Sequence, residues 1–234
     1  MKAIFYRELK AYFQTPVGYV FIGMFLAVSG YFFAVANLLP KSPDLGAVLS
    51  NMMMMFLFLI PILTMRLLSE EKNSKTDQLL LTSPVSVSSV VLGKFAAAAA
   101  IYLITLGITL LYLLVLGIHG QPAYAKIFCN YFGFILIGFS FISVGLFVSS
   151  LTQNQASAAM ATFAALLFLY ALEWSRGAVH NVFLVTLIDC LSITRWYSEF
   201  ELGVLSVPAI VYYVSFTAVF LLCTIHVMDK RRWS

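Results

Sequence analysis

The sequence predicts an all-α membrane protein with six transmembrane helices. Of its 234 residues, 62% are hydrophobic and only 10% are charged, whereas soluble proteins carry about 25% charged residues. Its charge-free apolar runs are long enough to cross a bilayer, which requires roughly 20 residues of helix. So few charges cannot cover a water-soluble globule. Soluble enzymes and soluble nucleic-acid binders are therefore excluded, and we expect membrane lipids but no nucleic acid as partners.

The charge-free runs locate the spans within a single domain, residues 1–234. Four runs predict one span each, at 17–37, 45–65, 95–118 and 208–228. The run 127–172 is too long for one crossing and contains the polar stretch Thr152–Gln155 near its middle, so we expect two spans, at 127–151 and 156–173. The first apolar run is longer than a signal peptide requires, and its leader contains Glu8. We therefore expect this span to be retained.

The N-terminal leader, residues 1–15, predicts an amphipathic interfacial helix. Its large apolar residues recur at i, i+4, i+7 and i+8, and they are Phe5, Leu9, Tyr12 and Phe13. We expect this helix to lie in the lipid headgroup plane, either as a simple anchor or as a lever that contacts a cytoplasmic partner. Thr15-Pro16 predicts the N-cap and first turn of the span that follows.

The distribution of basic residues predicts that both termini are cytoplasmic. With six spans, ten of the fourteen Lys and Arg residues lie on the cytoplasmic side, as the positive-inside rule expects. A seventh crossing through Gly177–Thr194 would move the basic tail Lys230–Arg232 outside and divide these residues equally. We therefore expect residues 177–207 to form a re-entrant or interfacial helical segment on the outer face.

The only substantial cytoplasmic loop, residues 66–94, is rich in charge. Within it Thr76 is expected to cap a short helix that Ser83-Pro84 ends. This helix would expose Leu79, Leu80 and Leu81. Exposed leucines beside charges either pack on the bilayer surface or bind a partner.

Several residues of this loop carry a family resemblance. They are Glu71-Lys72, Thr76, Leu80, Ser83-Pro84-Val85-Ser86 and Gly93-Lys94. Their pattern resembles that of membrane subunits of type-two ATP-binding-cassette (ABC) exporters, in particular the branch of gliding-motility and nitrous-oxide-reductase-maturation permeases. The resemblance implies a bacterial inner-membrane protein, a coupling helix at about 74–82 that docks on a separate ABC ATPase, and a dimer with itself or a second permease. The ATPase-coupling residues it implies are Glu71, Lys72, Thr76, Leu79, Leu80, Ser83 and Pro84.

The sequence predicts no catalytic or metal site on this chain. A phosphate-binding loop ending at Gly93-Lys94 would require glycine and a hydroxyl where Ser88 and Phe95 stand. The spans also lack the residue patterns of intramembrane serine, zinc and aspartyl proteases. ATP and Mg²⁺ are therefore expected on the partner ATPase.

The absence of charge from the predicted spans favours an apolar to weakly polar pathway. Charged side chains at the bilayer centre are costly, and ion-translocating proteins keep some of them. We expect the wall to include Asn51, Met52–Met55, Phe56, Tyr102 and Ser140, and the cargo to be lipid-like, amphipathic or polymeric. Candidate gate or cargo-contacting residues are Asn51, Met54, Asp189, Arg195 and Glu199. The alternative function is a non-transporting membrane scaffold, or a force-transmitting assembly factor, docked to an ABC ATPase.

Overall fold

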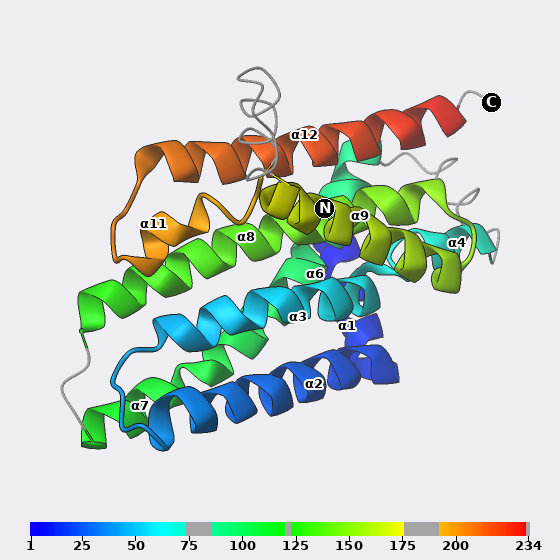
Figure 1. Cartoon of the computed structure of the whole chain (residues 1–234). Coiled ribbons are helices and arrows are strands. Elements are labelled where there is room, and N and C mark those ends of the chain that lie inside the picture. Colours follow the sequence, from blue (N-terminus) through cyan, green and yellow to red (C-terminus); the bar gives the residue numbers. More distant parts are fainter. Residues whose placement is uncertain (74–85, 120–122, 176–191, 233–234) are drawn as a thin grey trace.

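The computed structural model describes residues 1–73, 86–119, 123–175 and 192–232, and these form helices joined by short loops and turns (Figure 1). A short N-terminal helix, α1 (Lys2–Gln14), precedes α2 (Pro16–Phe33), and the end of α2 widens into the π-helical turn η1 (Ala34–Leu38). The remaining helices are α3 (Gly46–Thr64), α4 (Ser69–Asn73), α6 (Val87–Thr109), α7 (Leu111–His119), α8 (Tyr124–Leu151), α9 (Gln155–Ser175), α11 (Tyr197–Glu201) and α12 (Val207–Arg232).

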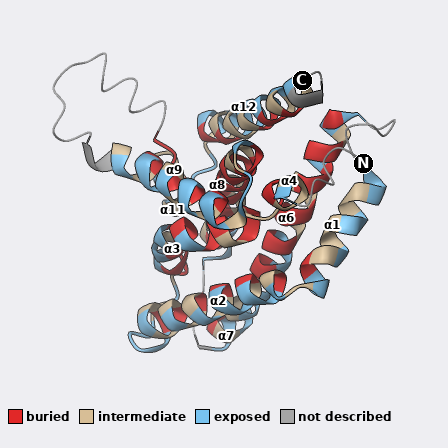
Figure 2. Cartoon of the chain, turned by 90° about the vertical axis from the view of Figure 1, so that its right-hand side faces the viewer, coloured by how far each residue is buried: buried red, intermediate tan, exposed pale blue. Residues whose placement is uncertain are grey.

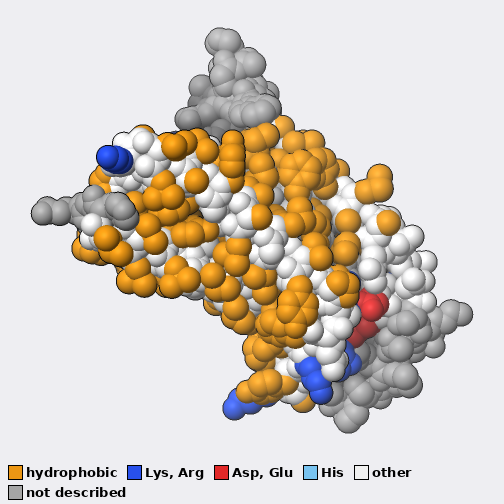
Figure 3. Space-filling view, turned by 90° about the horizontal axis from the view of Figure 1, so that it is seen from below, with side chains coloured by type: hydrophobic (Ala, Val, Ile, Leu, Met, Phe, Trp, Pro, Cys, Tyr) orange, Lys and Arg blue, Asp and Glu red, His pale blue; other side chains and the backbone are white. Residues whose placement is uncertain are grey.

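Six helical stretches are long and apolar enough to cross a membrane, which confirms the predicted all-α class. They are Pro16–Leu38, Gly46–Asn73, Val87–Ile118, Tyr124–Leu151, Gln155–Leu172 and Val207–Lys230. Hydrophobic side chains cover most of the face in Figure 3, and the charged ones lie toward its ends. We call the end of the bundle that holds α1 and α4, on the right in Figure 1, the N-terminal face, and the other end the opposite face.

Helix α8 is the centre of the bundle and contacts α3, α6, α9, α11 and α12. All three of its glycines, Gly133, Gly138 and Gly145, lie where any side chain would collide with a neighbour. A Cβ on Gly133 would come within 2.6 Å of Phe200, and one on Gly138 would overlap the ring of Tyr102. Small residues allow such close approach between helices in lipid, where the hydrophobic effect does not drive association.

Four buried aromatic side chains, one from each of α2, α3, α6 and α8, form the core. Their ring centroids lie 4.7–6.5 Å apart, and they are Phe25, Phe56, Tyr102 and Phe134. The expectation that Phe56, Tyr102 and Ser140 line a pathway is therefore wrong, since all three are fully buried inside this single chain. Pathway walls and packed cores have the same apolar composition, so the spans alone do not distinguish them.

The third span begins earlier than predicted. Ser86 occupies the N-cap position and α6 starts at Val87, not at residue 95, so residues 87–94 of the predicted loop 66–94 are helical. The first part of the predicted loop also contains a helix, α4. The predicted span began after Lys94 because this residue is charged. In the structure Lys94 lies inside α6, and its side chain is 1% exposed.

The predicted re-entrant segment, 177–207, is described only from residue 192 onward. This part contains α11, which packs against α8 and buries Phe200. The hydroxyl of Tyr213, in α12, donates a hydrogen bond of 2.6 Å to the carbonyl oxygen of Ile193. Residues 176–191, including Asp189, lie outside the described residues, so the re-entrant path stays a prediction.

Candidate functional site

Four charged side chains meet at the N-terminal face, where α1, α4 and α6 converge. We call Arg7, Glu8, Glu71 and Lys94 the ion cluster. Lys94 Nζ lies 3.0 Å from Glu8 Oε1 and 2.9 Å from Glu71 Oε1. Arg7 Nη2 lies 2.7 Å and 2.6 Å from the same two oxygens. Each carboxylate is shared by both cations, so the cluster joins three segments that are distant in the sequence (Figure 2 views this face).

The ion cluster is partly removed from water. The side chain of Lys94 is 1% exposed, and those of Glu8 and Glu71 are 14% and 15% exposed. Burial opposes ionisation of Glu8, but the charge of Lys94 and the hydrogen bonds from Arg7 and Lys94 outweigh it, so the pKa of Glu8 lies below its ordinary value. A buried ammonium group is tolerated only when it is paired and hydrogen-bonded, and the two carboxylates meet this requirement for Lys94.

Two further features hold α1 against the bundle. The hydroxyl of Tyr12, whose side chain is buried, donates a hydrogen bond of 2.6 Å to the carbonyl oxygen of Leu63 near the end of α3. Burial raises the pKa of Tyr12, which keeps this hydroxyl protonated. A Cβ on Gly93 would come 3.0 Å from Ile4, so glycine at this position of α6 lets α1 approach closely. Helix α1 is thus fixed to both α3 and α6.

Helix α4 is attached to the end of α8. Lys72 Nζ donates a 3.1 Å hydrogen bond to the carbonyl oxygen of Thr152 and also bonds that of Ser150. Ser149 Oγ accepts hydrogen bonds from the backbone amides of Leu68, at 3.1 Å, and Ser69, at 3.2 Å. The last carbonyls of a helix lack intrahelical partners, and a lysine near them is favourable. The segment that leads into 74–85 is therefore attached to the α8–α9 turn as well as to the ion cluster.

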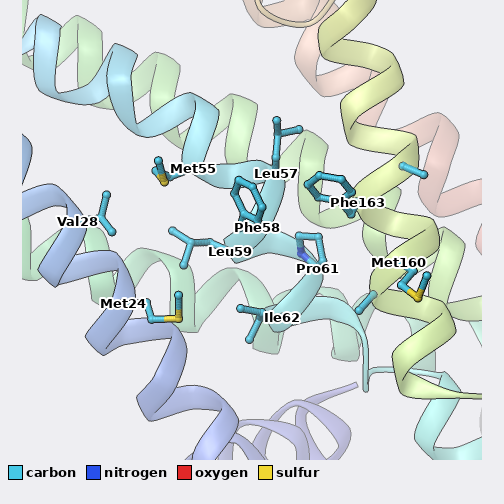
Figure 4. Close-up of a pocket in the computed structure, with 12 residues that line it drawn as sticks. Met24, Val28, Met55, Leu57, Phe58, Leu59, Pro61, Ile62, Met160 and Phe163 are labelled. Carbon is cyan, nitrogen blue, oxygen red and sulfur yellow. The ribbon is translucent and has the colours of Figure 1, made fainter.

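An apolar groove of about 730 Å³ lies between α2, α3 and α9 (Figure 4). The lining residues in the described part of the chain are all apolar, and they are Met24, Val28, Met55, Leu57, Phe58, Leu59, Pro61, Ile62, Ala159, Met160, Phe163 and Ala164. Within this lining the rings of Phe58, in α3, and Phe163, in α9, pack against each other with their centroids 5.2 Å apart. A groove of this volume and composition suits hydrocarbon or another apolar group.

The family model described as ABC-2 family transporter protein matches residues 11–228. The chain belongs to the ABC-2 transporter family. It is therefore an integral membrane protein and the permease component of an ABC transporter, a component that is generally non-catalytic and works with an ABC ATPase. A comparison with curated proteins finds no match to this permease.

The predicted ATPase-coupling residues fall in two groups. Glu71 and Lys72 lie in α4, where Glu71 belongs to the ion cluster and Lys72 binds the end of α8. The other five, Thr76, Leu79, Leu80, Ser83 and Pro84, lie outside the described residues. The coupling helix at 74–82 stays a prediction.

The predicted apolar stripe of the interfacial helix largely faces the protein. Tyr12 is buried, and Phe5 and Leu9 are partly buried against the core. Phe13 is 37% exposed and contacts the ring of Tyr19 edge-on. Packing on the bundle therefore accounts for most of the stripe, and the position of α1 in the headgroup plane stays a prediction.

Among the predicted gate or cargo-contacting residues, the four that the structure describes, Asn51, Met54, Arg195 and Glu199, do not line the groove. Asn51 is exposed on α3 and its Nδ2 donates to the carbonyl oxygen of Ala47 within the same helix, and Met54 is 49% exposed. At the opposite face, the guanidinium of Arg195 lies 5.8 Å from the ring centroid of Trp196, and Glu199 lies in α11. Asp189 lies outside the described residues.

Sequence reasoning missed Arg7, Glu8 and Lys94 as site residues. Charges in the chain are few, and Glu8, in the predicted interfacial helix, and Lys94, directly before a predicted span, carry opposite charges. This was the available signal. It did not identify the pairing, because the partners lie 86 positions apart along the chain.

Proposed function

We propose that this permease is the membrane subunit of an ATP-driven exporter of a lipid-like, amphipathic or polymeric substrate. A separate ATPase, which binds ATP and Mg²⁺, docks on the segment 66–94 and moves it. The observation that carries this proposal is the ion cluster. It links Glu71, close to the point where 74–85 leaves α4, to α1 and α6.

The contacts of α4 supply two routes for force. One runs through the ion cluster to α1 and α6, and the other through Lys72 to the α8–α9 turn. Helix α9 forms one wall of the groove, so displacement of this turn would change the groove. Rigid helices that shift against one another are a known way to change a packed cavity.

The groove supports an apolar or amphipathic cargo. The wall residues that the structure describes carry no side-chain group that would replace the hydration of an ion, which argues against a bare ion as substrate. Because the groove lies at the side of one chain, we propose that a second copy or a paralogous permease encloses it. The distribution of basic residues supports cytoplasmic termini, and we propose the bacterial inner membrane as the location. The pattern of the loop residues supports the gliding-motility or nitrous-oxide-reductase-maturation branch of the family.

Co-purification with the partner ATPase tests the docking segment. Leu80→Asp places a charge in the expected coupling helix, and Glu71→Ala removes one carboxylate of the ion cluster. We expect Leu80→Asp to lose the ATPase and Glu71→Ala to bind it less tightly, while Lys10→Ala, at an exposed position of α1, binds normally. Unaltered association of both variants, each shown to be folded, would contradict the coupling proposal.

Transport in proteoliposomes separates the exporter from the scaffold. Ala164→Phe narrows the groove, whereas Tyr31→Phe changes an exposed ring of α2 outside the groove lining. We expect Ala164→Phe to retain the ATPase but lose ATP-driven movement of a fluorescent lipid, and Tyr31→Phe to retain both. A folded Ala164→Phe complex that moves the lipid at the native rate would contradict the assignment of the groove.

A further inference from the structure

A second cavity, of about 380 Å³, lies at the opposite face between the end of α2 and α7. Its lining residues are Asn37, Leu38, Lys41, Ser42, Pro43, Val115 and Leu116. The first membrane-spanning stretch ends at Leu38, so the cavity lies at the boundary between the apolar span and the loop that follows. One side of the lining is apolar and the other carries an amide, a hydroxyl and an ammonium group.

The backbone around this cavity has an unusual local structure. In η1 the amide of Leu39 donates to the carbonyl oxygen of Ala34 at 3.0 Å, and the amide of Ser42 donates to that of Asn37 at 3.1 Å. Lys41 has φ 54°, a left-handed conformation that non-glycine residues seldom adopt. Single π-helical turns within α-helices occur frequently at functional sites. The loop thus has a defined shape that holds Asn37 and Lys41 at the same cavity.

Asn37 presents a buried acceptor. Its side chain is 1% exposed, and Nδ2 donates to the carbonyl oxygens of Ser42, at 2.8 Å, and Asp44, at 2.9 Å. These two bonds fix the carboxamide, whose Oδ1 accepts no hydrogen bond from any residue that the structure describes. The two bonds from Nδ2 hold the loop that places Lys41 at the cavity.

Together with Lys126 of α8, the charged residues of the loop, Lys41 and Asp44, carry one net positive charge. Asp44 Oδ2 lies 2.7 Å from Lys126 Nζ, so these two charges compensate one another. Burial opposes the ionisation of Asp44, but the hydrogen bonds from Lys126 and Gly46 outweigh it and keep its pKa below the ordinary value. Lys41 is exposed and forms no ion pair within the described parts of the chain. An anion at the cavity would meet one uncompensated cation.

We infer that this cavity binds the headgroup of an anionic glycerophospholipid such as phosphatidylglycerol. The phosphodiester would pair with Lys41, and an acyl chain would lie along Val115 and Leu116. A zwitterionic ethanolamine headgroup would instead bring an ammonium group near Lys41. This site is separate from the ion cluster and the groove, and the inference does not depend on the proposed transport function.

Native mass spectrometry of the detergent-solubilised permease tests the inference. The probes are dioleoyl phosphatidylglycerol, dioleoyl phosphatidylethanolamine and sn-glycerol 3-phosphate, each titrated separately. We expect phosphatidylglycerol to bind at least fivefold more tightly than phosphatidylethanolamine, about the factor that one lysine near a membrane surface contributes. Glycerol 3-phosphate, which lacks acyl chains, is expected to bind more weakly than either lipid.

Matched lysine variants locate the site. Lys41→Gln should remove the preference for phosphatidylglycerol, and Lys41→Arg should restore it. Lys10→Gln, at an exposed position of α1 on the N-terminal face, should leave it unchanged. Equal affinity for the two lipids in the native chain, or an undiminished preference in Lys41→Gln, would overturn the inference. Glycerol 3-phosphate binding as tightly as phosphatidylglycerol would show a soluble-phosphate site and overturn the lipid assignment.

Discussion

Replacing Lys94 by methionine removes the most buried charge of the ion cluster. The variant keeps the length of the side chain but leaves Glu8 and Glu71 beside each other, 14% and 15% exposed, with Arg7 as their only partner in the cluster. Two carboxylates that share a partly dehydrated site repel one another. We therefore expect the contact between α1, α4 and α6 to weaken.

The size of the effect follows from burial. Removing one member of a buried ion pair destabilises a protein by about 3–5 kcal/mol. Lys94, at 1% exposure, falls in this class. Both carboxylates are partly exposed and keep their bonds from Arg7, so we expect the lower end of this range. The unfolding free energy should fall by about 3 kcal/mol, which changes the unfolding equilibrium constant roughly 150-fold.

Titration with sodium dodecyl sulfate in mixed micelles, followed by circular dichroism, measures this change. Lys10→Met is the matched control, because Lys10 is an exposed lysine of α1, and surface substitutions usually stay within about 0.5 kcal/mol. The double variant Lys94→Met, Glu71→Gln should recover part of the loss, since it removes one of the uncompensated carboxylates. A Lys94→Met chain as stable as Lys10→Met would refute the assigned role of the ion cluster.

Three further predictions use the same unfolding assay. Tyr12→Phe should lower the unfolding free energy by about 1 kcal/mol through loss of its buried hydrogen bond, whereas Tyr6→Phe, at a 67% exposed position, should not. Gly133→Leu should destabilise by about 1–3 kcal/mol because its Cβ would meet a ring at 2.6 Å, while Gly23→Leu, with open space around it, should be tolerated. Because folding lowers the pKa of Glu8, its ionised carboxylate should contribute fully to the unfolding free energy above about pH 4.3, and this contribution should be lost as the pH falls through the pKa of the folded state. Glu8→Gln should therefore make the unfolding free energy less sensitive to acid.

The six spans are predictable because bilayer thickness fixes the length of an apolar helix and charge marks its ends. The same rule failed at Lys94. A charge ends a span only if it must reach water, and here Glu8 and Glu71 satisfy it inside the protein. Such compensation depends on tertiary structure, so the sequence pattern does not reveal it.

The groove was not predictable for a related reason. Phe56 and Phe58 are two positions apart in one apolar run, yet Phe56 is fully buried in the core and Phe58 is 52% exposed and lines the groove. A helix that is apolar on all sides gives no periodic signal of which side faces protein and which faces lipid. The small residues Ala159 and Ala164 in the fifth span were the visible hint of a space beside α9.

The central claim is that the ion cluster carries motion from the ATPase-binding segment to α1 and α6. Spin labels at position 6 of α1 and position 160 of α9, both exposed, report the distance between the N-terminal face and the groove wall by electron-electron resonance. In the complex with the partner ATPase, ATP binding should shift this distance in the native permease, and Lys94→Met should bind the ATPase but lose the shift. The same ATP-dependent shift in a folded, ATPase-bound Lys94→Met permease would contradict the claim.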